Sequence, residues 1–210
     1  MKTETLALRS LAGAELERVC ARLRDGGVAV FPTDTVYGIG TAAGSASGLE
    51  KIYSLKGRSS DKPLPLLADS LESALPIAYF TPDAGAAAMK FWPGALTMVL
   101  SALPPGRAYC RGGGTLGLRV PALEELRALI KALGSPLAAT SANLSGRPSA
   151  RDGDSAHAQF NGLVDFIFTG GDAMPGDSTV MDFSRPELTV LREGSLPSAV
   201  VLSYLKASPK

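Results

Sequence analysis

The apolar residues near the start of the chain follow first a helical spacing and then a strand-like run. Four of them recur at helical spacing between charged residues: Leu16, Val19, Cys20 and Leu23. With two glycines directly after it, this pattern predicts an amphipathic helix over residues 13–25. A continuous apolar run at 28–31 then predicts a strand buried on both faces, which Pro32 ends because proline cannot donate to a sheet.

The same two patterns predict further elements along the chain. Three more helices are expected: one capped by Ser47 and ending near Gly57, one at 81–91 capped by Thr81, and one at 123–133. Seven more strands are expected: 64–68, 96–103, 115–120, 137–140, 165–169, 179–183 and 188–191. Helices and strands alternate early and strands crowd late, so the sequence predicts an α/β fold with a twisted mixed β-sheet flanked by helices.

Length and composition are those of one globular domain. The chain has 210 residues, of which 45% are hydrophobic, with no internal repeat and no long linker. We expect a single domain over residues 1–210, with a core from about 10 to 195 and a C-terminal tail at 196–210. Two cysteines form neither a zinc pattern nor a disulfide framework, and no segment resembles a signal peptide or membrane span, so a cytoplasmic location is expected.

Polar side chains follow two of the predicted strands at the point where each strand ends. Thr33, Asp34 and Thr35 come after the strand at 28–31, and Ser141 with Asn143 follows the strand at 137–140. Open α/β sheets bind ligands at such strand ends. This placement predicts a ligand site at one edge of the sheet.

Cations accompany these polar groups. Five of them follow a predicted helix or lie at the ends of predicted strands: Lys56, Arg58, Lys62, Arg119 and Arg192. They either form a solvated surface or converge on one cleft, where they would suit phosphate or carboxylate groups. Arg119, flanked by Leu118 and Val120, either faces a ligand or forms an ion pair with an acid such as Asp34.

Other chemistries receive less support. The segment GIGTAA from Gly38 to Ala43 matches a dinucleotide-binding fingerprint, but it does not follow the strand directly, and we interpret its glycines as providing freedom in a turn. The chain has one histidine, His157, which we expect at the surface, so nucleophilic catalysis by a serine has no placed base. We expect no metal ligation by side chains alone, whereas a Mg²⁺ ion carried by the phosphates of a nucleotide would need little from the protein. The net charge of +1 leaves nucleic-acid binding to uneven charge placement.

Several motifs together resemble the YrdC/TsaC family of threonylcarbamoyl-AMP synthases. They are PTDTVYGIG, KGR followed by DKPLPLL, WPGALTMVL, LGLRVP, SAN followed by SGRPS, STVMDF and LREG. The resemblance covers the chain from the first helix to Gly194. It implies a YrdC-like fold with a large concave, cationic cavity. It also implies an enzyme that forms threonylcarbamoyl-AMP and pyrophosphate from threonine, bicarbonate and ATP, for modification of the adenosine beside the anticodon in tRNA.

The resemblance also assigns roles to individual residues. It implies that Lys56 and Arg58 are catalytic. The positions that it places at ATP are Lys56, Arg58, Lys62, Thr115, Ser141, Asn143 and Arg192. Arg151, which departs from the family pattern, is a further ATP-binding candidate that either touches phosphate or faces solvent. The positions that it places at threonine are Thr35, Arg119, Ser141 and Ser178. A separate threonylcarbamoyl transferase complex is the implied partner, and direct binding of tRNA or double-stranded RNA stays open.

Two positions depart from the family pattern. Leu67 stands where some members have a histidine near threonine, and Arg151 stands where a small hydroxyl residue is usual. The longer members have an additional C-terminal domain, for which we expect no room in this chain. Two alternatives to the synthase remain: an RNA-binding module of the same fold, and a carbamoyl-adenylate-forming domain, whose usual companion domain and zinc-binding cysteines are not in the sequence.

Overall fold

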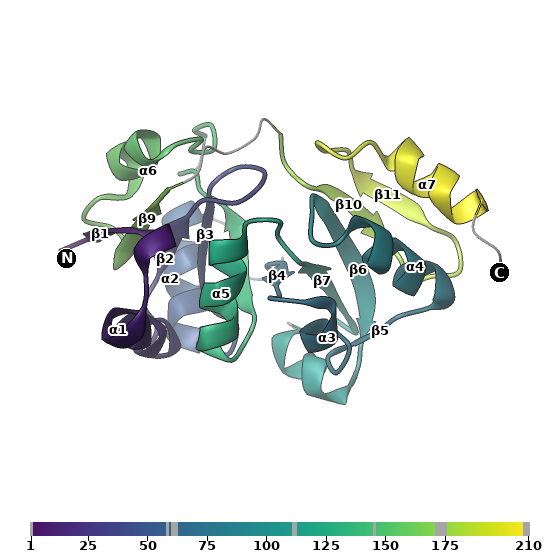
Figure 1. Cartoon of the computed structure of the whole chain (residues 1–210), viewed down its shortest axis with the longest axis horizontal. Coiled ribbons are helices and arrows are strands. Elements are labelled where there is room, and N and C mark those ends of the chain that lie inside the picture. The colour runs from purple at the N-terminus through teal and green to yellow at the C-terminus, as the bar shows by residue number, and fades with distance from the viewer. Residues whose placement is uncertain are drawn as a thin grey trace.

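Short strands form one mixed sheet in the computed structural model, which describes residues 2–57, 59, 63–110, 113–144, 146–170 and 176–207. The strands are β1 (Glu4–Ala7), β2 (Ala29–Phe31), β3 (Gly38–Ala42), β4 (Leu66–Leu67), β5 (Ala78–Tyr79), β6 (Leu96–Ala102), β7 (Thr115–Arg119), β8 (Leu137–Ser141), β9 (Phe166–Thr169), β10 (Thr179–Asp182) and β11 (Thr189–Arg192). Their order in the sheet is β1-β9-β2-β3-β8-β4-β7-β6-β10-β11, and β5 pairs with β6 (Figure 1). Parallel and antiparallel pairs both occur, which confirms the predicted mixed sheet.

Helices pack on the sheet and on one another. They are α1 (Gly13–Arg24), α2 (Ala46–Lys56), α3 (Leu71–Ala74), α4 (Pro82–Phe91), α5 (Glu124–Leu133), α6 (Gly153–Phe160) and α7 (Ser198–Ala207), with 3-10 turns η1 (Leu8–Ser10) and η2 (Pro104–Tyr109). Thr81 caps α4 and Gly134 ends α5 with a φ of 72°, as their sequence signals predict. None of the described helices has both the length and the apolar character needed to cross a bilayer.

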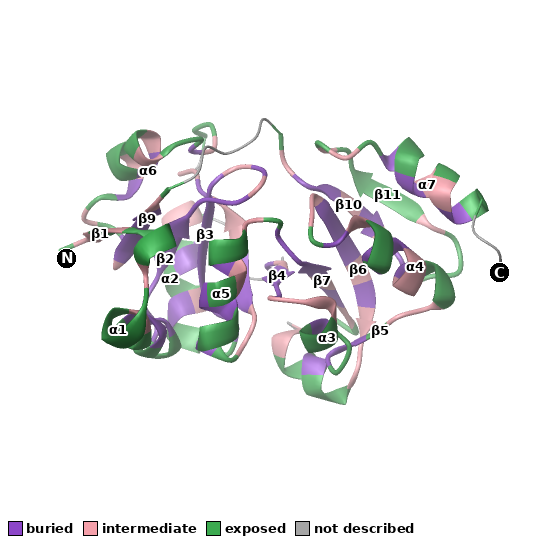
Figure 2. Ribbon diagram, in the orientation of Figure 1, coloured by how far each residue is buried: buried purple, intermediate pink, exposed green. Residues whose placement is uncertain are grey.

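The half of the sheet around β2, β3, β8 and β9 is covered on both faces. Because strand side chains alternate, Phe31 packs with Leu129 of α5 and Leu23 of α1, whereas Val30 packs on the side of Ile52 in α2. Figure 2 shows these interior strands as buried, between helices whose outer faces are exposed. The apolar run at 28–31 is therefore the two-sided strand that the sequence predicts.

The other half, around β6, β7 and β10, is covered differently. Leu96, Met98 and Leu100 of β6 belong to one core cluster with Ala84 and Ala88 of α4. The alternate residues of β6 and β7 point to the opposite face of the sheet. Several of these alternate residues, among them Thr97, Thr115 and Arg119, line the site described below.

Two expectations about local structure were wrong. Gly38 and Gly40 belong to strand β3 and not to a turn, and neither has a positive φ. A Cβ atom at Gly38 would lie 2.7 Å from the Phe31 ring, and one at Gly40 would lie 2.9 Å from the Ala138 carbonyl oxygen. These glycines serve close packing between strands. The cap of α2 is Ser45, whose hydroxyl accepts from Gly48 N at 3.3 Å, and not Ser47.

Residues on both sides of the predicted core of about 10–195 also pack against the rest of the fold. Strand β1 pairs in parallel with β9. Helix α7, within the expected tail, packs against α4 and adds Val201 and Leu205 to the core cluster. Residues 153–160 form α6 where no helix was expected, although His157 on it is exposed as predicted.

Candidate active site

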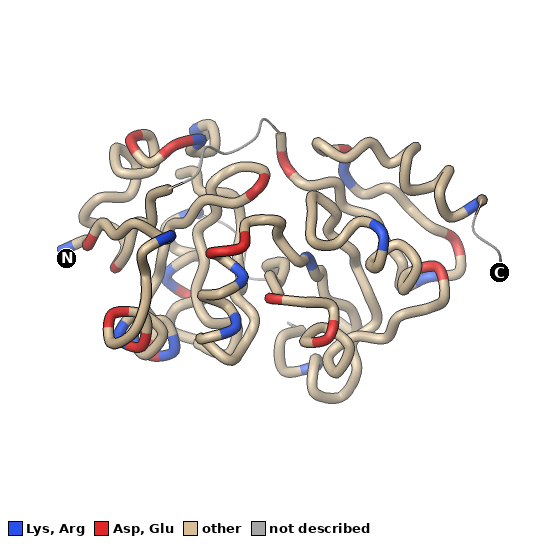
Figure 3. The backbone as a smooth tube through the Cα atoms, in the orientation of Figure 1, with Lys and Arg blue, Asp and Glu red and all other residues tan. Residues whose placement is uncertain are grey.

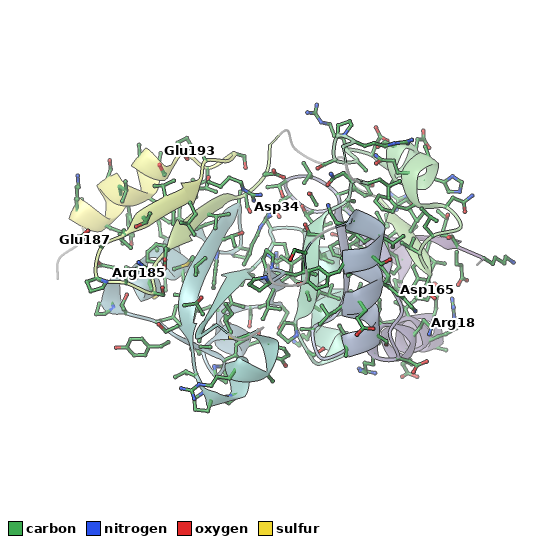
Figure 4. The ribbon with its side chains drawn as sticks, turned by 180° about the vertical axis from the view of Figure 1, so that it is seen from behind. Arg18, Asp34, Asp165, Arg185, Glu187 and Glu193 are labelled. Carbon is green, nitrogen blue, oxygen red and sulfur yellow. The ribbon has the colours of Figure 1, made fainter. Side chains whose placement is uncertain are left out.

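A cavity of about 340 Å³ opens between the two halves of the sheet. Its floor is built by alternate residues of adjacent strands: Thr115, Gly117 and Arg119 of β7, and Thr97 and Val99 of β6. The loop after β2 and the end of β8 form one wall, and residues around β10 and β11 form the other. Figure 4 places Asp34, on the loop after β2, between the two halves of the molecule.

Arg119 is the most buried charged group in this cavity. Its residue is 5% exposed, and its guanidinium has three protein acceptors. Nε donates to the Gly94 carbonyl at 2.9 Å, Nη1 to Thr35 Oγ1 at 2.8 Å, and Nη2 to Asp34 Oδ1 at 2.7 Å. A guanidinium has five N–H groups, so two donors are left for a ligand among the contacts of the described chain. The two readings of Arg119, ion pair and cavity residue, are therefore both correct.

Burial and charge act in opposite directions on this arginine. Burial lowers the pKa of the Arg119 guanidinium, and the neighbouring Asp34 carboxylate offsets part of that effect. Asp34 is itself held, because its Oδ1 also accepts from Ala122 N at 2.9 Å. The guanidinium stays protonated at neutral pH, since an arginine pKa starts far above that range.

A hydroxyl relay fixes Thr35. Thr33 Oγ1 donates to the Val36 carbonyl at 2.6 Å and accepts from Thr35 N at 3.0 Å. Since the single Thr33 hydroxyl hydrogen is used in this way, the 2.9 Å contact between the two hydroxyls must be donated by Thr35. Thr35 Oγ1 therefore accepts from Arg119 and retains one lone pair for a donor in the cavity.

A second polar cluster lies beside Arg119, next to Thr97 on the adjacent strand β6. Ser178 Oγ and Thr97 Oγ1 are 2.8 Å apart, and both residues are buried. Arg192 Nη2 donates to Ser178 Oγ at 3.1 Å and to the Ser178 carbonyl at 2.9 Å, while its Nη1 lies 3.5 Å from Asp177 Oδ2. The Arg192 side chain is 47% exposed, so this arginine lies at the mouth of the cavity.

Lys56, Ser141 and Asn143 form a third cluster beside the end of β8. Lys56 Nζ donates to the Ser141 carbonyl at 2.6 Å and to Asn143 Oδ1 at 2.7 Å. Ser141 Oγ donates to the same Asn143 oxygen at 2.9 Å. Ser141 lines the cavity, and Lys56 and Asn143 border it through this serine. Residues that are 85 and 87 positions apart are thus brought together, as the resemblance implies.

The remaining predicted site residues have different positions. Thr115 lines the cavity. Arg58 and Lys62 lie outside the described residues. Arg151 is exposed and is not among the cavity-lining residues; it lies just before the Asp152 cap of α6. Leu67 is buried and lines the cavity. It pairs with Arg119 in the register of β4 and β7, so its apolar side chain lies next to this arginine.

Sequence reasoning missed several cavity-lining positions. Thr97, Asp177 and Gly117 all line the cavity. Thr97 is part of the apolar run LTMVLSAL, where a single polar residue among strand formers gives a weak signal. An alternation rule applied to β6 and β7 together would have placed Thr97 on the same face as Arg119. Among the described residues, no group of three histidine, cysteine or acidic side chains could hold a metal ion.

Comparisons with known proteins point in one direction. A sequence model of the Sua5/YciO/YrdC family, described as "Telomere recombination", matches residues 21–194. The threonylcarbamoyl-AMP synthase of Pyrococcus abyssi is 38% identical over 179 residues, which cover 83% of this chain and 52% of that protein. A putative threonylcarbamoyl-AMP synthase of Mycobacterium leprae is 35% identical over 196 residues, which cover 90% of this chain and 87% of that protein.

A solved structure supports the same relationship. P. abyssi Sua5 complexed with L-threonine matches with a TM-score of 0.86 and 31% identity, over 97% of this chain and 61% of that one. The chain spans 52% and 54% of the curated relatives from P. abyssi and Bacillus subtilis. The match therefore extends over nearly the whole of this chain and about half of those longer relatives.

Proposed function

The chain belongs to the Sua5/YciO/YrdC family, and we propose that it synthesises L-threonylcarbamoyl-AMP and pyrophosphate from L-threonine, bicarbonate or CO₂, and ATP. The observation that carries this proposal is the arrangement of one cavity with two chemically different ends. Arg119, Thr35 and Ser178 form an amino-acid end, and Thr115, Ser141, Lys56 and Asn143 form a nucleotide end. We keep these two names below.

The amino-acid end suits a zwitterion with a short polar side chain. The two remaining N–H donors of Arg119 match the two oxygens of a carboxylate. Thr35 Oγ1 has a lone pair for the amino group, and the hydroxyl pair of Thr97 and Ser178 suits a β-hydroxyl. Leu67 supplies an apolar wall that suits the threonine methyl group. A site that hydrogen-bonds a hydroxyl discriminates strongly against an analogue without one.

The nucleotide end supplies cations and hydroxyls for phosphate oxygens. Lys56 supplies a point charge, and Arg192, which contacts Ser178 of the amino-acid end, adds a fork at the cavity mouth within reach of a phosphate. The family resemblance adds Arg58 and Lys62 to this end. Opposite charges placed where negative charge develops during phosphoryl transfer stabilise the transition state.

The reaction requires positioning more than covalent catalysis. The threonine nitrogen forms a bond to the carbon of CO₂ and loses a proton, giving a carbamate. A carbamate oxygen then forms a bond to the α-phosphorus of ATP while the bond from that phosphorus to the β-phosphate bridging oxygen breaks and pyrophosphate leaves. The cavity holds the two reactants close together and limits the water that would compete for the carbamate.

Magnesium enters this proposal with the nucleotide. Asp177 is the acidic residue that lines the cavity, and its carboxylate already pairs with Arg192. Phosphate oxygens would therefore supply most of the ligands, which fits the preference of Mg²⁺ for substrate phosphates and water. When bound, the ion neutralises charge on the phosphates.

The product is a mixed anhydride, so a separate transferase must consume it. In the proposal, a threonylcarbamoyl transferase complex passes the group to the adenosine beside the anticodon of tRNA. Figure 3 shows lysine, arginine, aspartate and glutamate spread over both halves of the described chain. The geometry favours the small-molecule reaction over an RNA-binding module.

Pyrophosphate release tests the proposed function. Purified protein with L-threonine, bicarbonate, Mg²⁺ and ATP should release pyrophosphate, and the release should require both threonine and bicarbonate. Arg119→Lys should lower kcat/KM for threonine by about 100-fold, because lysine cannot reproduce the fork that contacts Asp34, Thr35 and a carboxylate.

Arg18→Lys is the matched control. Arg18 also forms a bidentate pair, with Glu4, but it is exposed and lies away from the cavity. Its replacement should leave pyrophosphate release unchanged. Pyrophosphate release that does not depend on threonine would overturn the proposal, as would salt-sensitive RNA binding without any affinity for ATP.

A further inference from the structure

Gly117 occupies the centre of the cavity floor, in the middle of strand β7. Its backbone is that of a strand and has no positive φ, so conformation does not require a glycine. A Cβ atom placed there would lie 3.5 Å from Pro65 Cβ and 3.7 Å from Thr97 Cγ2, which are ordinary van der Waals distances. Packing does not require a glycine here either.

The glycines of β3 give a clear contrast. The Phe31 ring leaves no room for a side chain at Gly38 or Gly40, and the Ala138 carbonyl oxygen also blocks one at Gly40. Gly117 has no such neighbour, although a glycine in the interior of a strand weakens it. A strand glycine without a conformational or packing reason marks a place where a ligand approaches the backbone closely.

The register of the sheet shows which part of the cavity Gly117 keeps open. It lies opposite Val99 of β6, and Pro65 lies on its other side. Along β7, Thr115 and Arg119 are two residues away in either direction, roughly 7 Å each. Gly117 is therefore midway between the nucleotide end and the amino-acid end.

We propose that Gly117 is a specificity-determining position, whose missing side chain leaves room for an amino-acid carbamate and a nucleoside triphosphate to lie end to end in the cavity at the same time. This inference rests on the proposed function and adds a residue to it. A side chain at 117 would project from the floor at the junction where the carbamate oxygen must reach the α-phosphorus. It would leave the outer part of each end unobstructed.

Two substitutions at Gly117 introduce side chains of increasing size. Gly117→Ala adds one methyl group, which the local geometry accepts. Gly117→Val adds a branched side chain that suits strands and fills more of the junction. The alanine variant should have a Tm equal to or above that of the parent protein, because it reduces the freedom of the unfolded chain without strain in the folded one. The Tm of the valine variant shows whether its fold is kept.

Calorimetric titration measures whether both ligands fit together. The probes are L-threonine and an ATP analogue with a methylene group between the α- and β-phosphates, with which pyrophosphate cannot leave. With Gly117→Val, each ligand alone should bind within about threefold of the parent value, while saturating threonine should weaken analogue binding by at least about tenfold. Pyrophosphate release from ATP should fall by roughly 100-fold, and the alanine variant should lie between.

Gly85→Ala is the matched control. Gly85 lies in α4, has no atom within 4 Å of a Cβ placed on it, and does not line the cavity. Its replacement should leave the binding of both ligands and the pyrophosphate release unchanged.

The outcomes separate this inference from the proposed function. A parent protein that binds both ligands together and a valine variant that does so equally well would overturn the role of Gly117 and leave the proposed function standing. A valine variant that loses threonine or the analogue when each is offered alone would also overturn the placement at the junction. A parent protein that binds neither ligand would overturn both.

Discussion

The two ends of the cavity differ in how deeply their polar groups are buried. At the amino-acid end, Arg119 is 5% exposed, Thr35 2% and Ser178 6%, and each has at least one side-chain partner. At the nucleotide end, Lys56, Thr115, Ser141 and Asn143 are all half-buried. The first end is part of the protein interior, and the second is closer to its surface.

This difference indicates two ways of building a binding site. The amino-acid end is held in one arrangement before a ligand binds, at the cost of burying a charge. The nucleotide end is half-buried, and its cation Lys56 is a point charge on a long side chain that would have to exchange protein acceptors for phosphate oxygens. Substitutions at the amino-acid end should therefore reduce both stability and affinity, and those at the nucleotide end should reduce affinity alone.

The largest effect is expected at Asp34, the half-buried partner of the buried Arg119. Asp34→Ala removes the acceptor for Arg119 Nη2 and Ala122 N and leaves a buried guanidinium without its counter-charge. We expect the free energy of unfolding to fall by about 3 kcal/mol and threonine binding to be lost, because breaking a buried ion pair leaves an uncompensated charge. Urea denaturation and threonine titration measure the two effects.

Glu4→Ala provides the comparison at an exposed ion pair. Arg18 and Glu4 have side chains that are 50% and 43% exposed, and their contact is 2.9 Å. The loss should be about 0.5 kcal/mol, since solvent screens exposed pairs. An Asp34→Ala variant no less stable than Glu4→Ala would contradict the idea that the amino-acid end is built into the core.

A smaller effect is expected from the buried hydroxyl pair. Thr97→Val removes the hydroxyl group that lies 2.8 Å from Ser178 Oγ and keeps the shape of the side chain. The free energy of unfolding should fall by about 1 kcal/mol, as for one buried hydrogen bond. Threonine affinity should fall by about tenfold, because Ser178 loses one of the two groups that orient it.

Thr41→Val separates these two consequences. Thr41 is also fully buried, and its hydroxyl donates to the Gly27 carbonyl at 2.7 Å, away from the cavity. It should lose similar stability and no threonine affinity. Equal threonine affinity in both variants would remove Thr97 from the amino-acid end.

The elements with complete local signals could be predicted from the sequence. Helix α4 has a threonine cap and a proline at its first turn, and α5 has four buried residues at helical spacing and a glycine stop. Strand β3 was missed because its glycines are explained by contacts with Phe31 and Ala138 from two other strands. Such contacts depend on the register of the sheet, which local patterns do not specify.

The site shows the same limit. Arg119 drew attention because a charge stood among apolar residues, and Asp34 was one of the partners considered. The third acceptor of the guanidinium, the Gly94 carbonyl, depends on the path of the loop after α4, and no residue type signals it. The meeting of Lys56 with Ser141 and Asn143 came from the family resemblance, because spacing within the chain does not bring α2 to the end of β8.

The smallest effect on stability is expected at Lys56, at the nucleotide end. Lys56→Ala removes donors to the Ser141 carbonyl and to Asn143 Oδ1 in a half-buried setting, so the free energy of unfolding should change by less than about 1 kcal/mol. ATP affinity should fall by at least about tenfold, because a charge-assisted bond to a phosphate oxygen is lost.

Lys51→Ala is the matched control on the same helix, since Lys51 Nζ donates to the Gly26 carbonyl at 2.7 Å and lies outside the three polar clusters. If both variants keep the parent affinity for ATP, Lys56 does not belong to the nucleotide end. If Lys56→Ala instead lowers the free energy of unfolding as much as Asp34→Ala does, both ends contribute equally to stability and the contrast between them is wrong.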